Sequence, residues 1–307
     1  MMQTDKPLRL RLGHSPDPDD AFMWWPIVCD EGSAAGFDTG EFYFEQVLDD
    51  IESLNHRAQA GELEITAISC AQYPYVADRY ALTACGSSMG DNYGPKIVAR
   101  RAMGLDDLTR DGVILAVPGE RTSAFGATSL LLGPGAFRFQ VVEFDQIISR
   151  VAAGQFDAGL LIHEGQLTFA EAGLEMILDL GSWWTSRHGL PLPLGVSAIR
   201  RDLDDSHGPG TLQRVTTVLL ESLRFALAHR EEALQYALRF GRGTAPPLAD
   251  QFVSMYVNKW TLDFGAIGRE AVRTFLRQLN EAGLVPEPPS IEFIEPYWAA
   301  GPGELDV

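Results

Sequence analysis

The sequence lacks the glycine-rich motifs that bind nucleotides. No Gly-x-Gly-x-x-Gly follows the first strand-like segment, and no Gly-x-x-x-x-Gly-Lys-Ser/Thr loop occurs in the 307 residues. The first motif holds the pyrophosphate of a dinucleotide cofactor, and the second holds the phosphates of a nucleoside triphosphate. We therefore expect neither dinucleotide-dependent redox chemistry nor nucleotide hydrolysis.

Cysteine and long apolar runs are also scarce. The three cysteines, Cys29, Cys70 and Cys85, form no Cys-x-x-Cys pair and no cluster with histidine at metal-ligand spacing. This pattern predicts reduced thiols without a disulfide framework. No run of about 20 apolar residues could cross a bilayer, and the first residues lack the apolar core of a signal peptide. We expect a cytoplasmic protein with no membrane insertion.

Basic residues are few relative to acidic ones. Lys plus Arg number 24 against 42 for Asp plus Glu, which gives a formal net charge of −18. A chain of this charge is a poor partner for nucleic acid or an anionic membrane. The total charge does not exclude a small anionic ligand, because such a ligand responds to the groups nearest to it. The length suits about two domains, and a hydrophobic content of 46% can supply their cores.

Alternating and continuous apolar segments recur with helical segments between them, which predicts an α/β fold with mostly parallel sheets. The expected strands are residues 8–13, 41–47, 64–68, 95–100, 113–117, 139–143, 158–162 and 195–200. The expected helices are residues 21–29, 51–60, 70–78, 123–132 and 145–153, followed by amphipathic stretches at 212–240, 249–260 and 267–282.

The segments 95–100 and 195–200 flank a compact α/β insert of about a hundred residues. We predict that residues 1–98 and 200–307 form a larger discontinuous lobe and that residues 99–199 form a smaller inserted lobe. Two connecting strands would make a hinge, with a ligand cleft between the lobes.

His163 is the leading candidate for a catalytic residue. It directly follows the apolar run 158–162, which has the character of a buried strand. Ligands of open α/β sheets bind just beyond the carboxyl ends of strands, and an imidazole there can accept a proton near neutral pH. The alternative is that His163 hydrogen-bonds a loop carbonyl and has no chemical role.

Hydroxyl side chains follow two other predicted strands. Thr122 and Ser123 precede a helix whose N-terminus offers unpaired N–H groups to a carboxylate or phosphate, and Ser69 has the same position after residues 64–68. Each could equally cap its own helix. In the first loop, His14 and its neighbouring aspartates resemble a set of metal ligands, but the prolines and the following helix explain them as turn and cap residues. We predict no metal and no cofactor.

Two tryptophan pairs, Trp24 with Trp25 and Trp183 with Trp184, lie near predicted cleft loops. Their rings could stack on a flat ligand, or they could pack in the core.

Ordered motifs along the chain resemble those of one enzyme family. Residues 14–22, His-Ser-Pro-Asp-Pro-Asp-Asp-Ala-Phe, are similar to the Ser-Pro-Cys-Pro-Asn-Asp-Thr-Phe motif that opens the 1,4-dihydroxy-6-naphthoate synthases of the futalosine pathway to menaquinone. Further similar segments follow in the same order at residues 119–124, 161–169, 189–195, 200–202, 256–258 and 262–265.

The resemblance implies a two-lobe fold like that of the type 2 periplasmic binding proteins. It also implies a carbon–carbon lyase that converts cyclic dehypoxanthinyl futalosine into 1,4-dihydroxy-6-naphthoate and a sugar-derived fragment, with His163 as the base. The substrate-binding positions carried over from the family are Ala67, Ile68, Ser69, Thr122 and Ser123, and we add Ser15 and Asp19 from the first loop.

The chain departs from the family pattern at several positions. Family members tend to carry Asn, Thr and Thr where this chain has Asp19, Ala21 and Ser123, and often Lys where it has Ala67. Loss of a lysine would weaken attraction for an anionic substrate. Two alternatives therefore stay open: a chorismate dehydratase-like enzyme of the same pathway, and a small-molecule solute-binding protein. The sequence also leaves open whether the chain forms a homodimer.

Overall fold

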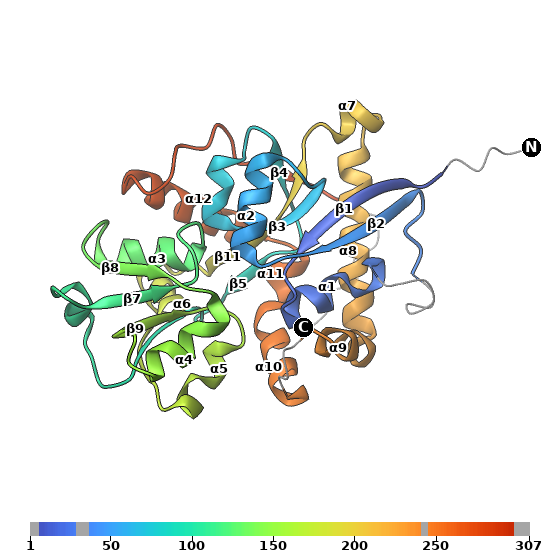
Figure 1. Ribbon diagram of the computed structural model, residues 1–307. Coiled ribbons are helices and arrows are strands. Elements are labelled where there is room, and N and C mark those ends of the chain that lie inside the picture. The colour runs from blue at the N-terminus through green and yellow to red at the C-terminus, as the bar shows by residue number, and fades with distance from the viewer. Residues whose placement is uncertain (1–5, 29–36, 241–244, 298–307) are drawn as a thin grey trace, which may run out of the picture.

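The computed structural model describes residues 6–28, 37–240 and 245–297, and two β-sheets organise them (Figure 1). The larger sheet has seven strands, six of them in the order β12-β4-β11-β3-β1-β2, with β5 paired to β11. These strands are β1 (Leu8–His14), β2 (Phe42–Leu48), β3 (Ile65–Ser69), β4 (Tyr80–Thr83), β5 (Ser88–Gly90), β11 (Leu192–Arg200) and β12 (Phe293–Ile294).

The smaller sheet has five strands in the order β10-β6-β9-β7-β8. They are β6 (Lys96–Ala99), β7 (Ile114–Val117), β8 (Arg138–Val141), β9 (Ala158–Leu161) and β10 (Glu175–Asp179). All five come from one continuous stretch of chain, whereas the larger sheet takes strands from both sides of that stretch. We call the larger sheet with its attached elements the large lobe, and the smaller sheet with its attached elements the small lobe. The residue boundaries that we expected for the two lobes from the sequence stay a prediction.

The expectation of mostly parallel sheets is wrong. Among the described strands, β1 runs parallel to β2 and β3, β4 runs parallel to β12, and β7 runs parallel to β8 and β9. By contrast, β11 is antiparallel to β3, β4 and β5, and β6 is antiparallel to β9 and β10. The physical reason is that β6 and β11 enter their sheets from the other lobe, without the crossover helix that makes neighbouring strands parallel.

Two helices match their predicted bounds, because capping residues that can be recognised in the sequence also cap these helices in the structure. In α2 (Ile51–Ala60), the side chain of Asp50 accepts hydrogen bonds from the amides of Glu52 and Ser53, and Gly61 ends the helix in a left-handed conformation. In α3 (Ser123–Leu132), Thr122 Oγ1 accepts from the amide of Phe125 at 3.1 Å.

Other helical predictions need correction. The predicted helix 70–78 is a short 3₁₀ helix, η1 (Cys70–Tyr75), because Pro74 has no N–H to donate within an α-helix. The stretch 212–240 breaks at His229 into α8 (Thr211–Ala228) and α9 (Arg230–Leu238). The stretch 249–260 becomes α10 (Pro246–Tyr256) and α11 (Lys259–Leu262).

The remaining helices are α1 (Pro18–Val28), α4 (Ile147–Ala152), α5 (Gly165–Thr168), α6 (Leu180–His188), α7 (Leu203–His207) and α12 (Gly265–Glu281), with 3₁₀ turns η2 (Leu105–Thr109), η3 (Phe144–Gln146) and η4 (Phe169–Ala172). Within the described part of the chain, none of the helices combines the length and the apolar character needed to cross a bilayer.

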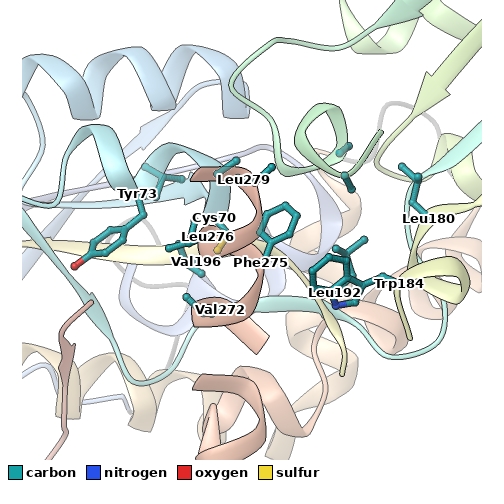
Figure 2. Close-up of a cluster of buried hydrophobic side chains, with 14 of the residues drawn as sticks. Cys70, Tyr73, Leu180, Trp184, Leu192, Val196, Val272, Phe275, Leu276 and Leu279 are labelled. Atoms are coloured by element: carbon teal, nitrogen blue, oxygen red, sulfur yellow. The ribbon is translucent and has the colours of Figure 1, made fainter. Parts of the chain in front are cut away.

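One hydrophobic cluster extends across both lobes. Figure 2 shows its centre, where Phe275 and Leu279 of α12 lie with Val196 of β11 and with Trp184 of α6. The rings of Trp184 and Phe275 meet edge to face with centroids 5.4 Å apart, and Trp184 Nε1 donates to the carbonyl of Pro191. This cluster fastens the small lobe to the helices of the large lobe.

The tryptophan pairs are core residues. Trp24 and Trp25 belong to α1 and are buried in a second cluster, and Trp183 packs against the first cluster beside buried Trp184. None of the four lines the cleft described below.

The two chain crossings between the lobes touch each other. The first runs from β5 to β6 through Tyr93 and Gly94, and the second runs from β10 into α6 through Gly181. A side-chain carbon at Gly94 would lie 3.0 Å from the amide nitrogen of Gly181, so the two backbones are in direct contact there.

Candidate functional site

A cleft lies between the lobes, with an empty space of about 720 Å³ that includes the part open to solvent. Its polar lining residues are Ser15, Asp17, Asp19, Asp20, Ser69, Ser88, Thr122, Ser123, His163, Gln166 and Tyr256. Its apolar walls are Ile51, Ala67, Pro95, Ala124, Ile162, Leu194, Val196 and Phe252.

His163 stands in this cleft, two residues beyond the end of β9. Its φ of +61° places a non-glycine residue in the left-handed region, which stores of the order of 1 kcal/mol of backbone strain. Strain of this kind persists where the surroundings hold it, and it clusters at functional sites. The bend turns the imidazole toward the loop that follows β1.

The two nitrogens of His163 have different surroundings. Nδ1 forms an ion-pair contact with Asp17 Oδ2, and the His163 side chain is 11% exposed. Nε2 is buried and has no hydrogen-bond partner among the described residues. A buried polar atom without a partner costs about 1–3 kcal/mol, so a native protein rarely keeps one without a use. The ring also packs on Phe144, with centroids 4.2 Å apart.

The first loop is built by its own hydrogen bonds. The amide of Ser15 donates to Asp20 Oδ2 at 2.9 Å, and Ser15 Oγ donates to Asp17 Oδ2 at 3.0 Å. Burial raises the pKa of Asp20 to about 6, and burial together with the neighbouring aspartates raises the pKa of Asp19. The three carboxyl groups thus share a poorly solvated end of the cleft beside His163.

His14 has a structural role. Its Nδ1 lies 2.7 Å from the carbonyl oxygen of Ser15, and its Nε2 lies 2.9 Å from Gln46 Nε2. Since a carbonyl can only accept, Nδ1 carries the proton and Nε2 accepts from the amide group of Gln46. Within the described residues, no three or more His, Cys, Asp or Glu side chains gather as a metal site would require.

Acid should weaken the protein through His14. Burial lowers the pKa of His14 to about 4, below its ordinary 6.5, so its contribution to stability is complete above pH 6.5 and is lost as the pH falls toward 4. The shift corresponds to about 3 kcal/mol. We expect the difference in unfolding free energy between the native protein and His14→Gln to move by about this amount in favour of the variant between pH 7 and 4. Urea unfolding at both pH values measures it, and an unchanged difference would contradict it.

Thr122 and Ser123 both line the cleft, but their hydroxyl groups are engaged within the protein. Thr122 Oγ1 caps α3, and Ser123 Oγ accepts from the amide of Ala71 at 3.2 Å while donating to the carbonyl of Leu194 at 2.6 Å. The amides of Ser123 and Ala124, in the first turn of α3, are the groups best placed to bind an anion. The helix begins where the sequence predicted, and Thr122 takes the capping role that the sequence left open, while the binding role of this helix start stays a prediction.

The predicted positions after β3 divide between cleft and core. Ala67 and Ser69 line the cleft, while the side chain of Ile68 points into the hydrophobic core. Ser69 Oγ accepts from Asn55 Nδ2 at 3.1 Å, and its amide donates to Asn55 Oδ1 at 2.8 Å. Ser15 and Asp19 also line the cleft, at its acidic end.

Besides the hydrogen bonds of Ser123 Oγ, further contacts bridge the lobes around the cleft. They include Asp17 with His163, Tyr256 Oη donating to Gln166 Oε1 at 2.8 Å, and the amide of Arg121 donating to Glu52 Oε1 at 3.3 Å. Burial raises the pKa of Tyr256 well above its ordinary value, so this phenol stays a hydrogen-bond donor. Both lobes thus contribute residues to one site.

Sequence reasoning missed five polar residues of the cleft: Asp17, Asp20, Ser88, Gln166 and Tyr256. Ser88 is the middle residue of Gly86-Ser-Ser-Met-Gly90, which has the spacing of a hydrolase nucleophile elbow. It opens β5 and donates weakly to Asp19 Oδ2 at 3.4 Å. Because an elbow serine follows a strand and precedes a helix, the spacing here carries no nucleophile.

Comparison with known proteins gives one consistent result. The family described as menaquinone biosynthesis matches residues 10–281. A 1,4-dihydroxy-6-naphthoate synthase of Thermus thermophilus is 37% identical over 93% of this chain and 99% of its own length. An enzyme of the same name from Streptomyces coelicolor is 33% identical over 90% of this chain and 95% of its own.

Solved structures show the same architecture. A protein of Archaeoglobus fulgidus, 38% identical, superposes with a TM-score of 0.80 over 90% of this chain and 98% of its own. The periplasmic aliphatic sulphonate binding protein of Escherichia coli superposes with a TM-score of 0.62 over 98% and 99% of the two chains, at 14% identity. The second likeness shows the fold alone, and it confirms the periplasmic-binding-protein architecture expected from the sequence.

Proposed function

The chain belongs to the menaquinone biosynthesis family, and from this premise we propose that it cleaves cyclic dehypoxanthinyl futalosine to 1,4-dihydroxy-6-naphthoate, with His163 as the general base. The observation that carries the proposal is the state of His163. A histidine in the cleft keeps one buried nitrogen without a partner while a carboxylate contacts the other. That is the arrangement of a proton acceptor waiting for its substrate.

The proposed reaction begins with transfer of a proton from a hydroxyl group of the pentose-derived part of the substrate to His163 Nε2. The electron pair left behind forms a carbonyl as the adjoining carbon–carbon bond breaks, in the manner of a retro-aldol reaction. The electrons of that bond pass into the bicyclic ring, which becomes aromatic and makes the step favourable. The protein's part is to hold the proton acceptor beside the correct atom and to exclude water.

The chemistry of the cleft walls supports one orientation of the substrate. Asp17, Asp19 and Asp20 gather beside His163, where carboxyl groups suit the hydroxyl groups of a sugar-derived fragment. The amides of Ser123 and Ala124 open α3, where a helix N-terminus suits a carboxylate. Between these ends lie the apolar walls, which suit a flat bicyclic ring.

The remaining positions are proposed as supports for this orientation. Ser15 and Asp19 would contact the hydroxyl-rich part, and Ala67 and Ser69 would flank the ring. Thr122 would act through the cap that sets the direction of α3. With alanine at position 67, the anionic end of the substrate depends on backbone amides without help from a lysine there.

The test is an assay of the purified protein with cyclic dehypoxanthinyl futalosine, in which the naphthoate product is followed by absorbance and mass. A parallel incubation with chorismate tests the dehydratase alternative. Product from the first substrate and none from the second supports the proposal. A folded protein that binds the first substrate and returns it unchanged would overturn the proposed lyase activity and favour a binding function.

A further inference from the structure

The structure assigns Asp17 as the positioning residue for His163: its carboxylate, which comes from the opposite lobe, holds Nδ1–H and thereby leaves Nε2 as the proton acceptor. This inference deepens the proposed function and rests on His163 acting as the base in it. The two side chains are 146 positions apart in the sequence and meet only through the fold.

The tautomer follows from the chemistry of the contact. An ionised carboxylate has no hydrogen to donate, so the nitrogen that it contacts must carry the proton. Because Asp17 contacts Nδ1, a neutral imidazole must keep its lone pair on Nε2. The opposite tautomer would leave Nε2 protonated and unable to act as a base. The carboxylate also stabilises the imidazolium that forms once the proton has been accepted.

Asp17 is itself held in place, as a positioning residue has to be. Its side chain is 5% exposed, and its Oδ2 accepts a hydrogen bond from Ser15 Oγ. Its backbone carbonyl accepts from the amide of Ala21 at 2.9 Å, which ties it to the start of α1. On the other side, Phe144 packs against the imidazole ring. The ring is therefore fixed by a carboxylate from one lobe and an aromatic side chain from the other.

The location of the pair on two lobes has a consequence for the reaction. His163 follows β9 of the small sheet, and Asp17 follows β1 of the large sheet. The oriented base is therefore complete only when the lobes are together. A ligand that draws the lobes together would both enter the cleft and finish the proton acceptor.

A purely structural ion pair is the competing explanation, and it makes a different prediction. Removal of a structural pair would lower stability and could loosen substrate binding, but it would not select between the tautomers of His163. The tautomer is therefore the decisive readout, and it can be measured without any turnover.

The first measurement uses the native protein labelled with ¹⁵N-histidine, with the His163 signals identified by their loss in His163→Gln. Long-range ¹H–¹⁵N spectra distinguish a protonated ring nitrogen from an unprotonated one. We expect a protonated Nδ1 and an unprotonated Nε2 when the ring is neutral. A protonated Nε2 in the native protein would overturn the inference without any variant and would leave the lyase assay unaffected.

The second measurement compares Asp17→Asn, Asp17→Glu and the matched control Asp145→Asn. Asp145 is an exposed carboxylate next to Phe144, so its replacement removes the same charge nearby without a contact to the ring. In Asp17→Asn the amide can donate to Nδ1, so we expect the other tautomer to appear and kcat to fall at least about tenfold with KM within about threefold. Asp17→Glu should keep the native tautomer and regain part of the lost kcat.

The control should match the native protein in both readouts, and thermal unfolding checks that each variant is folded. A folded Asp17→Asn protein with the native tautomer and native kcat would overturn the inference. If the proposed function is wrong, the native protein itself makes no naphthoate. The histidine spectra would still show whether Asp17 selects the tautomer of His163, so the two failures can be told apart.

Discussion

Replacement of His163 by alanine should lower kcat by about 10²- to 10⁴-fold, the range that one general base contributes. The fold should persist, because the imidazole packs on Phe144 at the cleft and its Nε2 supports no other described group. Stopped assays of the naphthoate product measure the loss, and substrate binding to the variant shows that the cleft is intact.

The space left by the missing ring offers a sharper form of this test. Free imidazole added to His163→Ala can occupy the position between Asp17 and Phe144 and accept the proton there, so we expect partial recovery of turnover. His56→Ala is the matched control, since His56 is exposed on α2 and lies outside the cleft. Near-native turnover in His163→Ala would exclude the proposed role, whatever imidazole does.

Replacement of Gly181 by alanine should lower the stability of the protein strongly. A side-chain carbon at this position would lie within 3.0 Å of three backbone atoms, the carbonyl carbon and oxygen of Tyr93 and the nitrogen of Gly94. Backbone atoms cannot rotate away as the end of a side chain can. Overpacking commonly costs about 1–3 kcal/mol, and we expect the upper end or more here.

Helix propensity alone predicts the opposite sign. Gly181 is the second residue of α6, where alanine would be favoured over glycine by up to about 1 kcal/mol. The steric cost is larger, so it should decide the outcome. Thermal unfolding should show Tm lowered by about 5 °C or more. Gly104→Ala is the control, because only Asp107 Oδ2 lies near that position, at 3.8 Å; equal Tm values for the two variants would refute the prediction.

Local signals predicted most of the elements. Asp50 and Gly61 mark both ends of α2, and the apolar run before His163 marks β9. The missed strands are short: β10 has five residues, β4 has four, β5 has three and β12 has two. Such strands carry too few side chains for a periodicity, and their pairing partners come from distant parts of the chain.

The site was predicted only in part, because sequence patterns report on local structure and not on contacts between distant residues. A strand end or a helix start can be recognised locally, so His163, Ser69, Thr122 and Ser123 were placed near a cleft. The contact between Asp17 and His163 has no local signal in the sequence. An aspartate in a proline-rich loop is typical of a turn, whether or not it contacts a distant residue. The hydrogen bond from Ser123 Oγ to Leu194 depends on β11, and Leu194 follows Ser123 by 71 residues in the chain.

The position of β11 also sets an order for folding during synthesis. This strand lies between β3 and β4 in the large sheet, yet it leaves the ribosome only after the whole small sheet has been made (Figure 1). The small sheet, being continuous in sequence, can fold as a unit, while β3 and β4 wait with unpaired edges for their partner. Closure of the large sheet is then a late, long-range event, and such events fold slowly. The nascent chain is most exposed to aggregation in the interval between the synthesis of β4 and that of β11.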